Sequence, residues 1–351
     1  MNALFLYCRA GFEKECAAEI QDLAAGLDVG GYCRTGAGSG YVVFQALTDD
    51  GASLLHDELS FPSLIFTRQW FVIAAHCRGL PADDRVSALL DALPATPACA
   101  ASLMVDSPDT NEGKSLSRLG RSLTPHLERA LRREGRLGSH KGLRWHVCLV
   151  DGREAYLGYA LVDNSAPWPM GVPRLRFPRQ APSRSTLKLE EALLTLLGED
   201  ERERRLKPGQ RAVDLGAAPG GWTWQLTRRG LRVTAVDNGP MDEGVMATGL
   251  VNHERADGFS YRPPEPVDWM VCDIVEQPTR VAELAARWLA RGWCRDTVFN
   301  LKLPMKKRYP TVQDCFQRMD RILKQAGVGY RLRCKQLYHD REEVTVYVQR
   351  R

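Results

Sequence analysis

Two lysines and two carboxylates, far apart in the chain, have the types needed to take a proton from a weak nucleophile. Lys302 stands near the end of the apolar segment "VFNLKL", and Lys188 stands in "RSTLKLEEA". Loss of water and a second nearby cation both lower the pKa of a lysine from ~10.4, which makes Lys302 a candidate general base. Asp273, which follows "WMVC", would balance the charge, while Glu343 and Lys188 would orient the base and the reacting hydroxyl.

A glycine turn inside "DLGAAPGGWTWQL" (residues 214–226) predicts a ligand site between a strand and a helix. A phosphate-binding P-loop would end in Gly-Lys-Ser/Thr, whereas Trp222 follows Gly221 here. The dinucleotide fingerprint needs the spacing G-x-G-x-x-G, which this loop lacks. S-adenosylmethionine has no pyrophosphate, so the loop favours this methyl donor. The loop residues expected to contact it are Gly216, Ala218, Pro219, Gly220 and Gly221.

Three acidic residues stand where a donor of this kind would need them. Asp237 ends the next strand-like segment, about 20 residues on, the distance at which doubly wound folds place a ribose-binding carboxylate. Asp257, in "RADGF", is placed to meet the adenine edge, and Asp273 ends a further strand at the same edge of the sheet. Each acid also suits an ordinary turn at a strand end. Three of them in register favour the donor site.

The methyl acceptor is inferred partly from motifs that are missing. Amine methylation of bases usually uses an Asn/Asp-Pro-Pro-aromatic turn, where this chain has "CDIVEQP". Carbon methylation of pyrimidines needs a thiolate nucleophile in a Pro-Cys setting, whereas Cys272 lies in an apolar segment typical of the core. A ribose hydroxyl is a weak nucleophile that needs its proton removed, so it fits the lysine and carboxylate set.

Two other classes of protein are weighed against this enzyme. A nicotinamide-dependent dehydrogenase would need the dinucleotide spacing that the loop lacks. A non-catalytic RNA-binding or ribosome-assembly factor with a vestigial donor pocket remains the alternative. The intact set of two lysines and two carboxylates argues against this alternative, because a protein without catalytic activity has no need of lysines in a partly apolar pocket.

The elements that must position these residues follow from hydrophobic periodicity. In the first half, short strands and helices alternate as one or two α+β units, with strands expected at 3–8, 40–47, 63–77 and 101–107, helices at 11–27, 83–93 and 115–135, and a hairpin at 144–162. Residues 164–184 hold five prolines and predict a semi-rigid linker. Beyond the linker, strand and helix segments alternate to the end, which predicts a mostly parallel sheet with helices on both faces.

The last strand, at about residues 342–350, offers two candidates for the fourth member of the set. Alternation along a strand predicts Val344, Val346 and Val348 on the buried face. Glu343, Thr345 and Tyr347 would then lie on the other face. We prefer Glu343, and Glu342 stays open.

These residues resemble those of a known family. Lys188, Asp273, Lys302 and Glu343 match the K-D-K-E tetrad of the heat-shock-type ribosomal RNA ribose 2'-O-methyltransferases. More narrowly, "PSRSTLKLEEA", "DLGAAPGGWTWQL", "VDNGPM", "WMVCD", "FNLKLPMKKRY" and "LYHDREEVTV" resemble the family of bacterial 23S rRNA cytidine 2'-O-ribose methyltransferases of the M type. The resemblance runs from about residue 175 to the end and is looser in the first half.

The resemblance implies an α/β fold in which a Rossmann-like S-adenosylmethionine-dependent methyltransferase domain follows an α+β ferredoxin-like and THUMP region. The implied domains are a ferredoxin-like domain at 1–75, a THUMP-type RNA-binding domain at 76–163, the linker at 164–184 and the methyltransferase domain at 185–351. It adds Ser185 to the donor pocket and makes Lys302 the proton acceptor. The implied target is a cytidine in the peptidyl-transferase region of 23S rRNA.

A basic segment predicts how RNA would be held. Residues 114–144 carry nine lysines and arginines against two glutamates. A solvated helix face is the ordinary explanation of such a run, but the excess of one sign favours contact with the RNA backbone. The candidate RNA-binding residues are Arg118, Arg121, Arg129, Arg132, Arg133 and Arg136, with Lys306, Lys307 and Arg308 beside the donor pocket. The expected partner is 23S rRNA, either naked or in an early assembly particle.

Composition sets looser limits. The 351 residues are 44% hydrophobic and 26% charged, and the net charge of +5 permits a polyanionic partner without arguing for one. We read no signal peptide and no membrane-spanning run, so a cytoplasmic protein without membrane contact is expected. The ten cysteines lack metal-ligand spacing, which predicts buried thiols and no metal site. We expect a monomer, because three domains of this size can bind RNA without a partner subunit.

Overall fold

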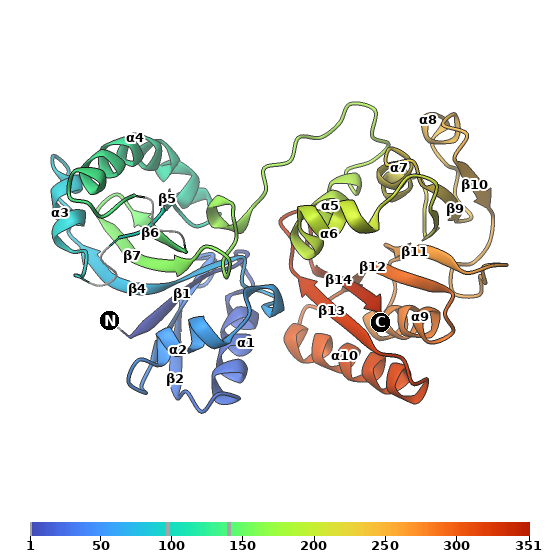
Figure 1. Cartoon of the computed structure of the whole chain (residues 1–351), viewed down its shortest axis with the longest axis horizontal. Helices are drawn as coiled ribbons and strands as arrows, with labels where there is room; N and C mark the ends of the chain where they lie inside the picture. The colour runs from blue at the N-terminus through green and yellow to red at the C-terminus, as the bar shows by residue number, and fades with distance from the viewer. Residues whose placement is uncertain (1, 96–98, 139–141) are drawn as a thin grey trace. The chain divides into compact units, whose positions relative to one another are not determined.

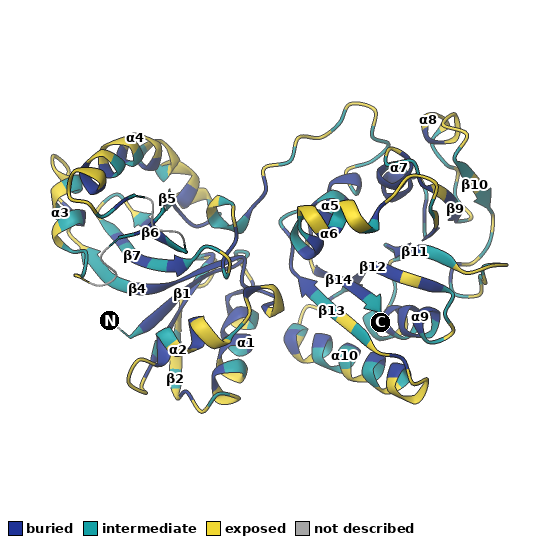
Figure 2. Cartoon of the chain, viewed as in Figure 1, coloured by how far each residue is buried: buried dark blue, intermediate teal, exposed yellow. Residues whose placement is uncertain are grey.

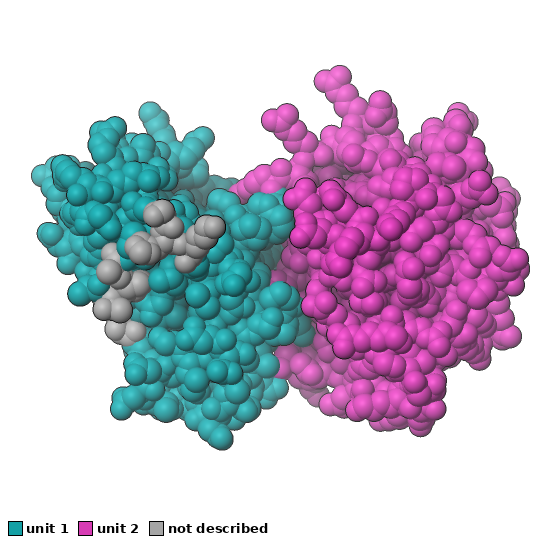
Figure 3. All heavy atoms as spheres, in the orientation of Figure 1, with its two compact units in different colours: residues 1–173 teal, residues 174–351 magenta. Residues whose placement is uncertain are grey.

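The computed structural model describes residues 2–95, 99–138 and 142–351. The chain divides into two compact units, Met1–Pro173 and Arg174–Arg351, which Figure 3 shows in different colours. The break between the units lies within the proline-rich segment expected as a linker. Among the described helices, none is long and apolar enough to cross a membrane.

The first unit is built on one seven-stranded sheet in the order β2-β3-β1-β4-β7-β6-β5. Its strands are β1 (Ala3–Tyr7), β2 (Gly31–Thr35), β3 (Tyr41–Ala46), β4 (Gln69–Arg78), β5 (Ser102–Asp106), β6 (Leu143–Asp151) and β7 (Glu154–Leu161). Its α-helices are α1 (Glu13–Ala25), α2 (Gly51–Glu58), α3 (Arg85–Asp91) and α4 (Asn111–Arg133). The predicted domain boundary at residues 75 and 76 falls inside β4, so both predicted domains would share this sheet. That division remains a prediction.

The second unit contains the mostly parallel sheet that the sequence predicts, in the order β10-β9-β8-β11-β12-β14-β13. Its strands are β8 (Arg211–Leu215), β9 (Arg232–Val236), β10 (Val251–Glu254), β11 (Val267–Cys272), β12 (Cys294–Lys302), β13 (Tyr330–Lys335) and β14 (Glu343–Arg350). Strands β8 to β12 pair in parallel, and β14 is antiparallel to both neighbours. This arrangement confirms the predicted α/β fold class.

Helices cover both faces of this sheet. They are α5 (Thr186–Ala192), α6 (Glu199–Arg205), α7 (Gly221–Thr227), α8 (Glu243–Met246), α9 (Pro278–Ala290) and α10 (Arg308–Gln325). Figure 1 shows α5 and α7 on one side of the strands and α9 and α10 together on the other. Apolar residues of α9 such as Val281, Ala285 and Leu289 are buried, whereas α10 also carries exposed residues (Figure 2).

The last strand differs from the prediction in one respect. Glu343, Thr345 and Tyr347 do lie opposite the valines, but all six residues from 343 to 348 are at most 3% exposed. The physical reason is that β14 lies inside the sheet, between β12 and β13, with packed side chains on both faces. Tyr347, for example, stacks near Trp269 at 6.1 Å between ring centroids and donates a hydrogen bond to Asp296 at 2.7 Å.

Candidate active site

The four residues of the predicted tetrad meet at the carboxyl ends of β11 and β12. Lys302 is the register partner of Glu343 in the β12–β14 pair, so the sheet itself sets these two side by side. Lys302 Nζ lies 2.5 Å from Asp273 Oδ1 and also contacts Glu343 Oε2. Lys188 Nζ, from α5, lies 2.5 Å from Glu343 Oε1 and 3.4 Å from Asp273 Oδ2. Each lysine therefore bridges both carboxylates.

The cluster changes the predicted charge state of Lys302. Burial by itself lowers the pKa of the Lys302 ammonium, but the carboxylates of Asp273 and Glu343 outweigh burial, and the pKa is raised above its ordinary value. The expectation of a lowered pKa is wrong. The sequence indicates a second lysine nearby, but it does not show how closely the two carboxylates approach Lys302 Nζ. Lys302 is therefore protonated at neutral pH in this structure.

Two glycines give the donor loop its shape. Gly216 has φ +76°, and a Cβ there would lie 2.6 Å from Ile274 Cγ1. Gly220 has φ +115°, in the left-handed region that side chains disfavour. The loop leads from the end of β8 into α7, beside Asp273 and the tetrad. Side chains would not fit at these positions, and the role of the loop in donor binding stays a prediction.

The predicted ribose acid is tied to this loop. Asp237 Oδ2 accepts a hydrogen bond from the backbone N–H of Ala218 at 3.1 Å, and Oδ1 accepts one from Gly239 at 2.7 Å. Asp257 follows β10 at the same edge of the sheet, is exposed, and accepts from the backbone of Phe259 at 3.1 Å. The ligand roles of Asp237 and Asp257 stay predictions.

Comparisons with known proteins agree with this geometry. Three family models match: the RlmM ferredoxin-like domain over residues 1–71, the N-terminal model of ribosomal RNA large subunit methyltransferase M over 84–161, and the FtsJ-like methyltransferase over 181–320. Relatives named ribosomal RNA large subunit methyltransferase M are 51% identical over 348 residues in Cellvibrio japonicus, covering 99% of each chain, and 51% identical over 353 residues in Xanthomonas campestris pv. campestris strain B100, covering 100% of each. The chain belongs to this family. The resemblance predicted from the motifs is confirmed.

In this member of the methyltransferase M family, several buried residues beneath the site were not singled out from sequence. Asp214 lies near the end of β8, just before the donor loop, and is 1% exposed. Its carboxylate accepts a hydrogen bond from Thr223 Oγ1 at 2.6 Å. Burial, aided by the charge of Asp273, raises the pKa of Asp214 to about 7. The acid in "DLG" was the available signal. Asn300 and Thr345 carried no such signal, because a single polar residue within an apolar strand belongs to no recognisable motif.

Cys272 has the structural role that the sequence predicts. Its side chain is 1% exposed in β11, and burial raises the pKa of the thiol to about 12. A nucleophilic cysteine needs a thiolate, which such burial disfavours. All ten cysteines fall within the described ranges and are free thiols, seven of them buried.

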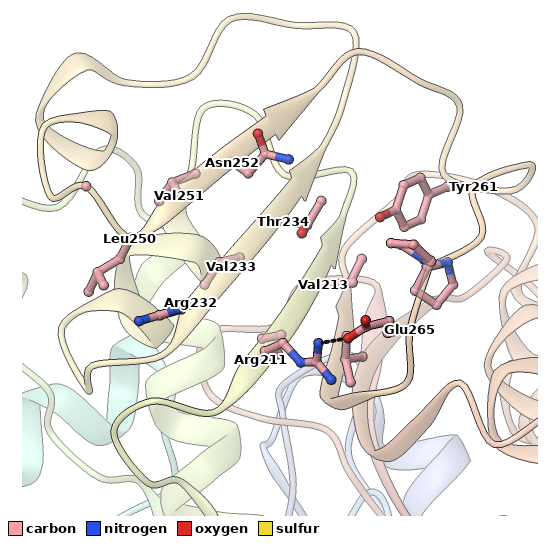
Figure 4. Close-up of a pocket in the computed structure, with 15 residues that line it drawn as sticks. Arg211, Val213, Arg232, Val233, Thr234, Leu250, Val251, Asn252, Tyr261 and Glu265 are labelled. Atoms are coloured by element: carbon pink, nitrogen blue, oxygen red, sulfur yellow. Dashed lines mark hydrogen bonds and ion pairs between the residues drawn. The ribbon is translucent and has the colours of Figure 1, made fainter.

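The cavity in Figure 4 is separate from the donor loop. It measures about 500 Å³ and lies against the amino-terminal ends of β8 and β9, where Arg211 and Arg232 begin the strands. Figure 4 shows Arg211 paired with Glu265, and Tyr261 is another residue that lines the cavity. Ligands of open α/β sheets bind at the carboxyl ends of the strands, so this cavity is not the candidate donor site.

The predicted RNA-binding residues fall into three settings. Exposed positions on α4 carry Arg118, Arg121, Arg129, Arg132 and Arg133. Arg136 lies beyond the end of α4, where its guanidinium donates to the carbonyl of Pro94 and sits 5.4 Å from the Trp145 ring. Lys306 and Lys307 are exposed beside Lys302, whereas Arg308 pairs with Glu342 at 2.6 Å. The α4 arginines and the tetrad belong to different units.

The contact of Gly221 with α5 gives a test of the donor loop. A Cβ at Gly221 would lie 2.3 Å from Ser185 Oγ and 3.1 Å from the backbone nitrogen of Thr186, so Gly221→Ala must push the start of α5 away from the loop. Overpacking of this kind costs ~1–3 kcal/mol, and we expect donor affinity to fall about tenfold or more. Calorimetric titration with S-adenosylmethionine measures this. Gly152→Ala is the control, because nothing lies within 4 Å of its Cβ; equal affinity in both variants would contradict the expected contact.

Proposed function

We propose that this chain transfers a methyl group from S-adenosylmethionine to the ribose 2'-hydroxyl of a cytidine in the peptidyl-transferase region of 23S rRNA, with Lys302 as the proton acceptor. Membership in the methyltransferase M family supports rRNA of the large subunit as the substrate class. The observation that carries the chemistry is the cluster in which Lys188 and Lys302 each bridge Asp273 and Glu343. A hydroxyl must give up its proton as its oxygen attacks the methyl group, so a proton acceptor suits this nucleophile.

The residues of the donor loop fit the proposed cofactor. Gly216 and Gly220 supply the backbone conformation for close approach, and the Asp237 carboxylate lies against the loop. Ser185 joins them, since its backbone oxygen accepts from Trp222 Nε1 at 3.0 Å at the start of α7. S-adenosylmethionine supplies an electrophilic methyl group when bound.

The protein side of the reaction is proton transfer and positioning. Lys302 must be neutral before its Nζ can accept the proton of the hydroxyl. The cluster holds two positive and two negative charges, so neutral Lys302 leaves it with one net negative charge. Lys188 remains as an ammonium that keeps Asp273 and Glu343 in place. Once Lys302 has taken the proton, the balanced arrangement is restored.

RNA contact is assigned to the exposed face of α4. Arg118, Arg121, Arg129 and Arg132 follow spacings of three and four residues or their sums, so they share one side of the helix. Lys306 and Lys307, next to Lys302, would hold phosphates near the target nucleotide. Naked 23S rRNA and an early assembly particle are both candidate substrates, and a monomer is the proposed functional form.

A charge reversal on α4 tests this assignment. Arg129→Glu with Arg132→Glu is expected to weaken RNA affinity and to make the affinity less dependent on salt. The reason is that a protein with fewer phosphate contacts releases fewer counterions when it binds. The same change at Arg321 and Lys324 on α10 keeps the spacing and the charge difference and serves as the control. Affinity measured over a series of salt concentrations reports the slope. If the salt dependence of RNA affinity is unchanged in the α4 variant, the exposed face of α4 does not contact RNA.

The proposed function is tested by transfer of labelled methyl groups. Unmodified 23S rRNA is incubated with S-adenosylmethionine and the protein, and the product is mapped by nucleotide and by position on the nucleotide. A ribose methyl on a cytidine is the expected result. Methyl on a base would overturn the proposed chemistry. Donor binding without transfer, to naked rRNA and to assembly particles alike, would favour the alternative of a non-catalytic assembly factor.

A further inference from the structure

A second pair of polar residues lies directly behind the tetrad on the same two strands. In the β12–β14 register Lys302 faces Glu343, and two residues further along Asn300 faces Thr345. Side chains alternate along a strand, so both pairs lie on one face of the sheet. Asn300 and Thr345 are fully buried, and Asn300 Nδ2 donates to Asp273 Oδ1 at 2.9 Å. The tetrad is therefore connected to a buried hydrogen-bonded chain.

The direction of the hydrogen bonds in this chain follows from donor and acceptor counts. An ionised Asp273 only accepts, so Asn300 turns its amide N–H towards Asp273 and its oxygen towards Thr345, 2.7 Å away. Thr345 has a single hydroxyl hydrogen, which it gives to Asn300. Both oxygens of Asp340 lie 3.1 Å from Thr345 Oγ1, which can then only accept from them. A carboxylate there would face a lone pair, whereas a carboxylic acid completes the chain.

The surroundings of Asp340 favour the acid form. Asp340 is 1% exposed, and one of its oxygens accepts from the backbone N–H of Leu337 at 2.9 Å. Burial and the negative charge of Glu343 raise the pKa of Asp340 well above its ordinary value. Glu191 on α5 raises the pKa of Asp340 as Glu343 on β14 does, whereas Lys188 on α5 lowers it, and burial remains the largest cause. Buried Lys335 on β13 is the register partner of Thr345. Glu191 is itself held by His339 at 2.6 Å.

We propose that Asp340 keeps a proton at neutral pH and, through Thr345 and Asn300, holds Asp273 where it pairs with both lysines. The inference rests on the proposed function, in which Lys302 must lose a proton. An ionised Asp340 would add a third negative charge beside Glu343 and make that loss harder. Asp340, Thr345 and Asn300 are thus positioning residues that also set the charge balance of the cluster.

Two substitutions of Thr345 test the hydrogen-bonded chain from Asp340 to Asp273. Thr345→Val removes the hydroxyl, leaves Asn300 without this donor, and is expected to lower the single-turnover rate of methyl transfer about tenfold or more. It also frees Asp340 to ionise, so the rise of rate with pH is expected to move to higher pH. Thr345→Ser keeps the hydroxyl and is expected to restore both rate and profile. Thr297→Val, a buried threonine of β12 on the opposite face, is the control. A Thr345→Val protein with wild-type rate and pH profile would overturn the proposal.

The protonation of Asp340 is measured on the resting protein without any substrate. The infrared difference spectrum between wild type and Asp340→Asn at neutral pH is expected to show the carbonyl band of a protonated carboxyl group. Carboxylate bands in its place would overturn the proposal whether or not the protein methylates RNA. Conversely, failure of methyl transfer with the protonated band present would count against the proposed function alone. If Asp340→Asn does not fold, the Thr345 kinetics still decide.

Discussion

Lys302→Ala is expected to retain S-adenosylmethionine binding and to lose methyl transfer by a factor of about 10² to 10⁴, the range for a lost general base. The loss follows because Lys302 is the lysine on the β12 strand end that contacts both carboxylates. Lys188 pairs with the same carboxylates from α5 and still compensates one of their two negative charges. Single-turnover transfer and calorimetric titration with the donor measure the two effects separately.

Two further proteins make this comparison decisive. Lys324→Ala removes an exposed lysine at the far end of α10 and is expected to behave as wild type in both measurements. Lys302→Arg keeps the positive charge but not the ability to become neutral, so it is expected to be as inactive as the alanine variant. An active Lys302→Arg protein would exclude Lys302 as the proton acceptor. Lost donor binding in Lys302→Ala would place Lys302 in the donor pocket.

The rate of methyl transfer by the wild type is expected to rise about tenfold for each pH unit through the neutral range and beyond. The carboxylates of Asp273 and Glu343 raise the pKa of Lys302, so only a small fraction of the free protein carries the neutral amine near pH 7. The rise ends where Lys302 has lost its proton. The ion pairs of the cluster have the opposite dependence: their contribution to stability is present at lower pH and is lost as pH rises through the raised pKa.

Glu343→Gln tests the cause of this pH dependence. Removing one of the two carboxylates that raise the Lys302 pKa is expected to move the rise of rate to lower pH, even though the maximum rate falls. Glu342→Gln is the matched control, since Glu342 pairs with Arg308 outside the cluster. The pH profile of single-turnover transfer is the measurement. A profile that does not move in Glu343→Gln would mean that another group sets the pH dependence.

The glycine turn and the alternation of strands and helices were predictable from sequence because both depend on local patterns. The spacing of Gly216, Gly220 and Gly221 excludes phosphate and dinucleotide loops, and the observed φ values require glycine at the first two. Segments of alternating strand and helix character led to the doubly wound sheet. Short elements such as β2, β10 and α2 were missed, since four to eight residues carry little periodic signal.

The types of the tetrad residues were also predictable, but their energetics were not. Residue type and strand position identified Lys302 and Asp273 as candidates. The direction of the Lys302 pKa shift depends on two carboxylates within hydrogen-bonding distance, which outweigh burial. Only the packing of α5 and β14 against the end of β12 determines those distances.

By itself, the sequence predicted the methyl-donor loop, the α/β sheet and three residues of the tetrad, Lys188, Asp273 and Lys302, because glycine spacing, periodicity and side-chain chemistry are properties of short segments. The tertiary structure decided that Glu343, rather than Glu342, joins the cluster, because the β12–β14 register places it opposite Lys302. It also decided that Asn300, Thr345 and Asp340 form a chain beneath Asp273. Hydrogen-bond partners and net charge at a site depend on which distant segments pack together, and no short segment carries that information.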